Sequence, residues 1–153
     1  MGLAIPLHVL AVVIWVGGMF FAYLVLRPVA ASQLEPPARL TLWVGVFGRF
    51  FPWVWVCVLT ILGSGLGMVF GVFAGFAGSP LYVHVMFGLG IVMMLIFMHV
   101  FFAPYGRLKR AVAAQDWPAG GKALAQIRVL VGINTSIGLF TIAIASAGKY
   151  LAL

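Results

Sequence analysis

Four long apolar runs, almost free of charged side chains, determine what this chain can fold into. They cover about residues 3–26, 50–75, 81–103 and 127–151, and each is longer than 20 residues. At a rise of 1.5 Å per residue, such a run forms a helix that crosses about 30 Å of hydrocarbon. The sequence therefore predicts an all-α integral membrane protein, with all 153 residues in one four-helix up-down bundle.

Charged residues are too scarce for a soluble protein. They make up 7% of the chain, whereas soluble domains contain about 25%, and a disordered chain needs more charge and fewer apolar residues. The nine Lys and Arg residues outnumber the two acidic ones, and they lie at the ends of the apolar runs. We therefore expect contacts with membrane lipid and no nucleic-acid partner. No carboxylate lies within a run, which argues against hard-cation sites built on Asp or Glu.

The connections between the predicted helices differ strongly in their content of basic residues. Eight of the nine Lys and Arg residues lie in segments 27–49 and 104–128, and only Lys149 lies elsewhere. By the positive-inside rule, these two segments face the cytoplasm and both termini are periplasmic. We therefore expect a multi-pass protein of the bacterial inner (cytoplasmic) membrane.

The first basic segment is predicted to contain a helix of its own. Leu40, Trp43 and Phe47 recur at helical spacing after a break at residues 35–37. This pattern predicts a short amphipathic helix that lies at the inner membrane surface. Segment 115–121, in contrast, is predicted to be a polar turn.

Two histidines are the strongest candidates for chemistry inside the predicted spans, where polar side chains are costly. His8 lies five residues into the first span and His84 about three residues into the third. Both spans start at the outer face, so both imidazoles lie about 5–8 Å below it. Spans one and three are diagonal in an up-down bundle, so the two histidines could ligate one metal or one haem iron. Alternatively, each histidine separately bonds a neighbouring backbone or hydroxyl group.

The surroundings of the two histidines fit a flat ligand. Trp15 and Gly18 share a helical stripe with His8, and Gly88 follows His84 by one turn. Small residues beside a ligating histidine leave room for a macrocycle, although close helix packing explains them equally well. Lys149 is the outer-side cation that could meet an acidic group of the ligand; alternatively, it snorkels to the interface.

A third histidine, His99, lies near the predicted inner end of the third span. It follows His84 by fifteen residues, or about 22 Å of helix, so it cannot share a ligand with His8 and His84. It is either a second candidate metal site or an interfacial histidine bonded to Asn134 or to water.

The methionines give a weaker indication of copper. Met94 and Met98 lie one helical turn apart, but Met19, Met68 and Met86 are scattered along the chain. Thioethers suit Cu(I), yet methionine is also an ordinary packing residue in lipid. Because no M-x-x-M or M-x-M motif occurs, the sequence does not favour a methionine pathway for copper.

A ridge of glycines marks one side of the predicted second span. Gly63, Gly67, Gly71 and Gly75 recur at four-residue spacing. Such a ridge is typical of close helix packing. It predicts that another span, or a second protomer in a homo-oligomer, packs against this side.

Two segments resemble known membrane proteins. The stretch from Pro6 to Phe20, PLHVLAVVIWVGGMF, resembles the first span of the copper-resistance protein D (CopD) family and of the related HemJ-type protoporphyrinogen oxidases. The segment from His84 to Val100, followed by Pro-Tyr-Gly-Arg at residues 104–107, is similar to the third span of both groups.

The resemblance implies different cofactors for the two groups. The HemJ-like proteins bind haem b through a histidine of the first span, which corresponds to His8. They also have a lysine two residues after the histidine of the third span, where this chain has Met86; this departure argues against the oxidase activity. The CopD-like proteins are copper-uptake or copper-tolerance proteins.

The sequence leaves two functions open besides a packing subunit without ligand. The first is a haem-b-binding membrane redox protein with a bis-histidine haem near the periplasmic face. Such a protein would be a membrane oxidoreductase or electron-transfer protein, with a redox partner or quinone. The alternative is a copper-handling protein of the CopD type. Because His8 and His84 lie at one depth, the sequence favours haem b over copper.

Overall fold

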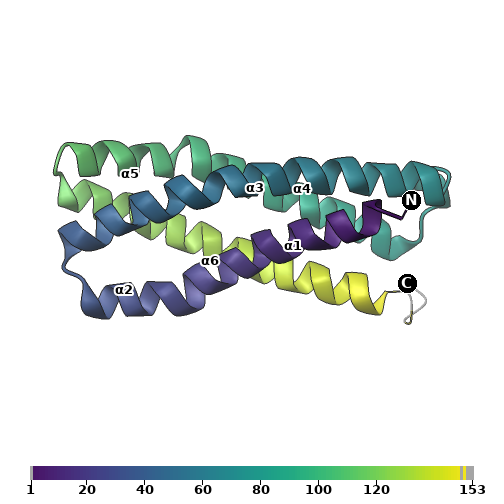
Figure 1. Ribbon diagram of the computed structural model, residues 1–153, viewed down its shortest axis with the longest axis horizontal. Coiled ribbons are helices and arrows are strands. Elements are labelled where there is room, and N and C mark those ends of the chain that lie inside the picture. The colour runs from purple at the N-terminus through teal and green to yellow at the C-terminus, as the bar shows by residue number, and fades with distance from the viewer. Residues whose placement is uncertain (1, 149, 151–153) are drawn as a thin grey trace.

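The computed structural model describes residues 2–148 and 150, and all regular structure in them is helical (Figure 1). The elements are α1 (Ala4–Phe20), the π-helix η1 (Phe21–Leu26), α2 (Arg27–Gln33), α3 (Pro36–Val72), the 3-10 helix η2 (Phe76–Gly78), α4 (Leu81–Phe102), α5 (Pro104–Ala113) and α6 (Trp117–Ala147). Within the described residues, they form four helical segments long and apolar enough to cross a membrane. The predicted all-α, four-helix membrane protein is confirmed.

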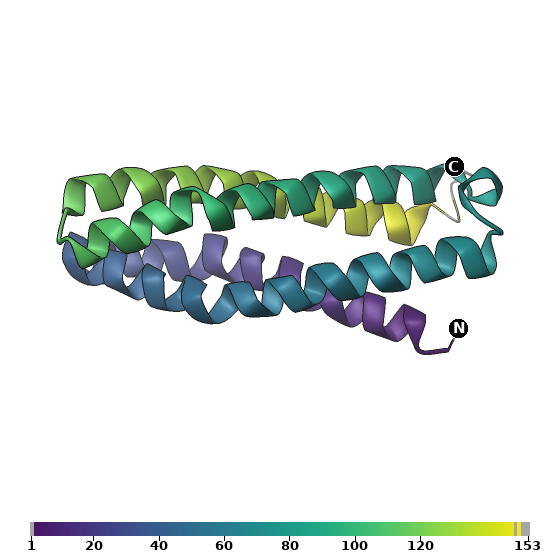
Figure 2. The same ribbon diagram turned by 90° about the horizontal axis from the view of Figure 1, so that it is seen from above.

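The four segments run up and down along one long axis, so that both basic connections meet at the same end. Figures 1 and 2 show the start of α1 and the end of α6 at one end of the bundle. The α2–α3 and α5–α6 connections lie at the opposite end, which we call the basic end. The helices pack mainly in two pairs, α1 with α3 and α4 with α6. The orientation of this bundle in the membrane stays a prediction.

The first span is longer than predicted, because helix continues through Arg27 and Pro28. A proline removes one helical N–H donor and crowds the carbonyl group four residues earlier, here that of Leu24. The π-helix η1 ends at Leu26, two residues before this proline, and it includes Leu24; its wider turns accommodate the crowding. The helix then ends at Gln33 rather than at Leu26.

The predicted separate amphipathic helix at the membrane surface is wrong. Its residues are the first turns of α3, a single helix of 37 residues. Leu40, Trp43 and Phe47 are buried inside the bundle instead of facing lipid. The difference lies at the other end of the predicted helix, where no break separates it from the second span and Pro52 lies inside the continuous helix. At about 55 Å, α3 is longer than the hydrocarbon is thick, so the bundle extends beyond the bilayer.

The other predicted boundaries shift for similar reasons. Pro104 occupies the first turn of α5, so the third segment continues to Ala113 after a single-residue break at Ala103. α6 begins at Trp117, ten residues before the predicted span, because the Asp116 carboxylate caps it by accepting the Ala119 N–H at 3.0 Å. The predicted polar turn over 115–121 is therefore mostly helix.

Aromatic side chains fill the core of the half nearer the basic end. Phe47 stacks on Phe51 with ring centroids 5.0 Å apart, and Tyr105 meets the Phe51 ring edge-on at 4.9 Å. Phe97 lies against Phe51 at 5.5 Å and against Trp15 at 6.2 Å. Such large, interlocking rings pack α3, α4 and α5 together. Most of these rings also border an apolar cavity of about 330 Å³, and a separate cavity lies in the other half of the bundle.

Candidate functional site

A cavity of about 420 Å³ lies between α1, α3, α4 and α6 in the half of the bundle away from the basic end. Most of its lining is aliphatic. The lining side chains that contain nitrogen, oxygen or sulfur are His8, Trp15, Met68, Tyr82, Met86, Met93, Met94 and Thr141. The cavity therefore combines an apolar wall with a few soft donor atoms, which is the usual build of a ligand site.

His8 is held in this cavity by two small residues of α3. Its Nδ1 lies 2.9 Å from the hydroxyl oxygen of Ser64, and its Cε1 would lie 3.4 Å from a Cβ atom on Gly65. The Ser64 hydroxyl has one proton, which it donates to the carbonyl oxygen of Thr60 in its own helix. The hydroxyl oxygen therefore accepts from Nδ1–H of His8, and in the neutral ring that carries this proton the Nε2 lone pair is available to a metal. Metal-binding histidines commonly have such a second partner.

Four methionines from two antiparallel helices line the same cavity. Met68 belongs to α3, whereas Met86, Met93 and Met94 belong to α4. Met93 and Met94 are buried, and the other two are half-buried. Linear motifs do not reveal this set, since the methionines meet only through the fold. One signal was available: Met86 and Met93 are seven residues apart, which places them on one face of a helix.

The side chains that could bind a metal in this cavity limit which metal ions it can hold. Among residues 2–148 and 150, no group of three or more His, Cys, Asp or Glu side chains could hold a metal ion. A metal in this cavity would therefore rely on thioether sulfur together with the His8 imidazole. This donor set fits Cu(I) and does not fit Mg²⁺ or Ca²⁺, which need oxygen ligands.

His84 has different contacts from His8. It is exposed on α4, does not line the cavity, and lies against the ring of Phe76 with centroids 6.0 Å apart. Its Nδ1 is 3.2 Å from the carbonyl oxygen of Pro80. Gly88 is exposed on the same helix, with open space beside it. These contacts are the ones expected for two histidines that act separately, and a haem shared by His8 and His84 stays a prediction.

The other residues predicted beside a haem have different surroundings. Trp15 is almost fully buried and lines the cavity. The ring of Phe50 occupies the space beside Gly18, so this glycine serves the close packing of α1 on α3 that was the alternative explanation. Lys149 lies outside the described residues.

His99 does not form the predicted hydrogen bond with Asn134. The buried Asn134 amide donates instead to the carbonyl oxygen of Met93, 3.3 Å away, and lies 3.7 Å from the sulfur of Met19. His99 is exposed near the end of α4. The second metal site at His99 stays a prediction.

The glycine ridge of α3 points away from the bundle. Gly63 and Gly67 are exposed, with no atom near the position of an added Cβ. α3 ends at Val72, so Gly75 is outside the helix, where it adopts a positive φ of 103° in the turn. The predicted contact of this ridge with a second protomer stays a prediction. The neighbouring Ser64 and Gly65, in contrast, face His8.

Comparison with known proteins identifies one family. Its model, described as copper resistance protein D (CopD), matches residues 44–147, which is more than half of the chain. The match includes Ser64 and all the methionines of the cavity, whereas His8 precedes it. Searches of curated proteins and of solved structures gave no match.

Proposed function

Since the chain belongs to the copper resistance protein D (CopD) family, we propose that it is a copper-handling membrane protein that binds Cu(I) in the cavity described above. Copper was the alternative in the sequence analysis, where haem b was favoured. The family match supports copper rather than haem. The single observation behind the proposal is the donor set: one imidazole and four thioethers in one apolar cavity.

The ligand chemistry selects the oxidation state of the metal. Thioether sulfur is a soft ligand and suits Cu(I), whereas Cu(II) prefers nitrogen and oxygen in a square-planar arrangement. An apolar wall also penalises charge, and this penalty is larger for a doubly charged ion. Cu(I) is therefore the form of copper that this cavity accommodates best.

His8 is the one imidazole in the cavity lining and the natural anchor for the ion. The Ser64 hydroxyl accepts a hydrogen bond from Nδ1–H of His8 and fixes the orientation of the ring, and Nε2 of the neutral ring is then the nitrogen that binds the ion. The thioethers of Met68, Met86, Met93 and Met94 line the same cavity, and we propose that the remaining ligands of the ion come from this set. Met86 stands at the position where the HemJ-like proteins have lysine, and a thioether there adds a ligand in place of a positive charge.

All these ligands are neutral, so a bound Cu(I) keeps its full positive charge in an apolar environment. No acidic side chain lines the cavity within the described part of the chain. A buried ion without a counter-charge is costly, and binding is therefore weaker than at a thiolate site. Such a site suits copper that is received and passed on rather than stored. With the predicted topology, the cavity takes copper from the periplasmic side.

Copper binding by the purified full-length protein tests the proposal. Detergent-solubilised protein would be titrated anaerobically with Cu(I) in competition with a chromogenic Cu(I) chelator. We expect one ion per chain, no binding in His8→Ala, and at least about tenfold weaker binding when Met86 and Met94 are both changed to Leu.

The chain offers matched controls for both changes. His99→Ala and Met98→Leu remove an imidazole and a thioether from residues that do not line the cavity, and both should bind copper like the unmodified protein. Failure of the unmodified protein to bind Cu(I), or equal losses in the controls, would overturn the proposal. A Soret band in the purified protein would instead favour haem.

A further inference from the structure

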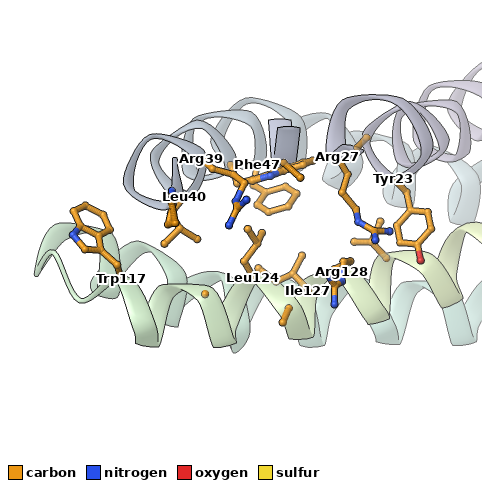
Figure 3. Close-up of a pocket in the computed structure, with 16 residues that line it drawn as sticks. Tyr23, Arg27, Arg39, Leu40, Phe47, Trp117, Leu124, Ile127 and Arg128 are labelled. Carbon is orange, nitrogen blue, oxygen red and sulfur yellow. The ribbon is translucent and has the colours of Figure 1, made fainter. Parts of the chain in front are cut away.

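A second pocket, of about 240 Å³, lies at the basic end between α2, α3 and α6. Three arginines from these three helices line it: Arg27, Arg39 and Arg128. Figure 3 shows the side chains of Arg27 and Arg39 reaching from one wall of the pocket towards the wall that holds Arg128. The copper proposal makes no use of this pocket.

The positive charge of the pocket has no acidic partner in its lining. None of the described residues that line it is acidic. Asp116, one of the two acidic residues of the chain, already caps α6. Arg27 stacks over the ring of Tyr23 at 5.0 Å, which orients its guanidinium group without neutralising it. The three guanidinium groups that line this pocket therefore attract an anion.

Two of the three arginines of the pocket, Arg27 and Arg128, lie at the level where lipid phosphates are found. Arg27 directly follows 24 uncharged residues, 3–26, and Arg128 directly precedes 20 uncharged residues, 129–148. At 1.5 Å per residue these helical stretches measure about 36 and 30 Å, which matches the hydrocarbon thickness. Because α1 and α6 run in opposite directions, both arginines meet the same boundary of the bilayer.

The remaining lining is apolar, so the pocket has two chemical sides. Trp43, Phe47 and Leu124 line it together with the arginines. Guanidinium groups bind phosphate oxygens in bidentate fashion, whereas the apolar wall suits the glycerol and acyl part of a lipid. Basic pockets between transmembrane helices on the cytoplasmic side are known to bind such headgroups. We propose that this pocket binds the phosphate of an anionic phospholipid, which bridges α2, α3 and α6.

Lipid binding by the detergent-purified full chain tests this proposal, with native mass spectrometry as the readout. Phosphatidylglycerol and cardiolipin should remain bound to the protein, whereas phosphatidylcholine and inorganic phosphate at the same concentration should not. Equal retention of phosphatidylcholine would overturn the proposal. Equal binding of inorganic phosphate would show a site for free phosphate and would overturn the lipid assignment.

Variants separate a built site from general attraction to positive charge. Arg39→Gln and Arg128→Gln should each lose more than about tenfold in affinity for phosphatidylglycerol, since each variant removes charge-assisted hydrogen bonds to the phosphate. Arg49→Gln is the matched control, because Arg49 is exposed on α3 only two residues after Phe47 and does not line the pocket. It should lose about twofold or less. Equal losses in all three variants would overturn the proposal.

Discussion

The hydroxyl of Ser64 provides the sharpest prediction about copper binding, because it lies outside the set of proposed ligands. Ser64→Ala removes one oxygen atom and keeps the rest of the residue. In the structure that oxygen accepts from Nδ1 of His8 at 2.9 Å, while the hydroxyl proton is donated to Thr60. The variant therefore leaves the imidazole in place but removes the partner that fixes its tautomer and orientation.

The size of the effect follows from this one hydrogen bond. A half-buried N–H that loses its acceptor costs about 1–3 kcal/mol, and 1.4 kcal/mol corresponds to a tenfold change in affinity. Loss of a second partner of a metal-binding histidine typically weakens metal binding by about 10–100-fold. We expect Ser64→Ala to bind Cu(I) about 10–100-fold more weakly, measured by competition with a chromogenic chelator.

Ser136→Ala is the control for this substitution. Ser136 is exposed on α6 and donates only to the carbonyl oxygen of Gly132 in its own helix, at 3.0 Å. The control should bind Cu(I) as the unmodified protein does. A Ser64→Ala protein within about twofold of the unmodified affinity would refute the reasoning about His8, and so would an equal loss in Ser136→Ala.

Three further predictions concern the same cavity, the packing around it and the topology. Gly65→Ala should keep copper binding, because its Cβ would lie at an ordinary 3.4 Å from the His8 ring; Gly65→Leu should abolish binding in the same titration, since its longer side chain overlaps the imidazole. Gly138→Val should lower the free energy of unfolding by about 1–3 kcal/mol in a denaturation experiment, because a Cβ there already meets Val16 at 2.9 Å and Met93 at 3.0 Å; unchanged stability would contradict the packing of α6 on α1 and α4. A reporter fused after the last residue should be active only in the periplasm, and cytoplasmic activity would invert the topology.

The sequence predicts the number of helices well and their lengths poorly. Uncharged runs define the parts that cross the hydrocarbon, but polar residues outside the bilayer extend the same helices. The prolines are ambiguous in sequence: Pro36 and Pro104 begin helices, whereas Pro28 lies within a helix that continues to Gln33. Only the tertiary packing decides between these outcomes, since proline is compatible with a first turn and, next to a π-helix, with a helix interior.

The sequence predicts the depth of the candidate site residues in the bundle. It does not predict which side chains of α4 face the cavity, because that depends on the rotation of α4 about its own axis. The depth of His84 follows from its position in the sequence, but its direction does not, because α4 is apolar on every side and no face is marked for the core. The helix turns Met86, Met93 and Met94 towards the cavity and leaves His84 exposed. The sequence of α1 also does not show which way the His8 side chain points. Its orientation comes from α3, where Ser64 contacts Nδ1 and Gly65 leaves room for the ring.

X-ray absorption spectroscopy of the Cu(I)-loaded protein tests the central claim most directly, because it identifies the atoms around the metal. We predict mainly sulfur scatterers together with one nitrogen, and loss of the sulfur contribution when Met68, Met86, Met93 and Met94 are all changed to Leu. A copper ion surrounded only by nitrogen and oxygen, or a sulfur contribution that persists in the fourfold variant, would contradict a thioether site in this cavity.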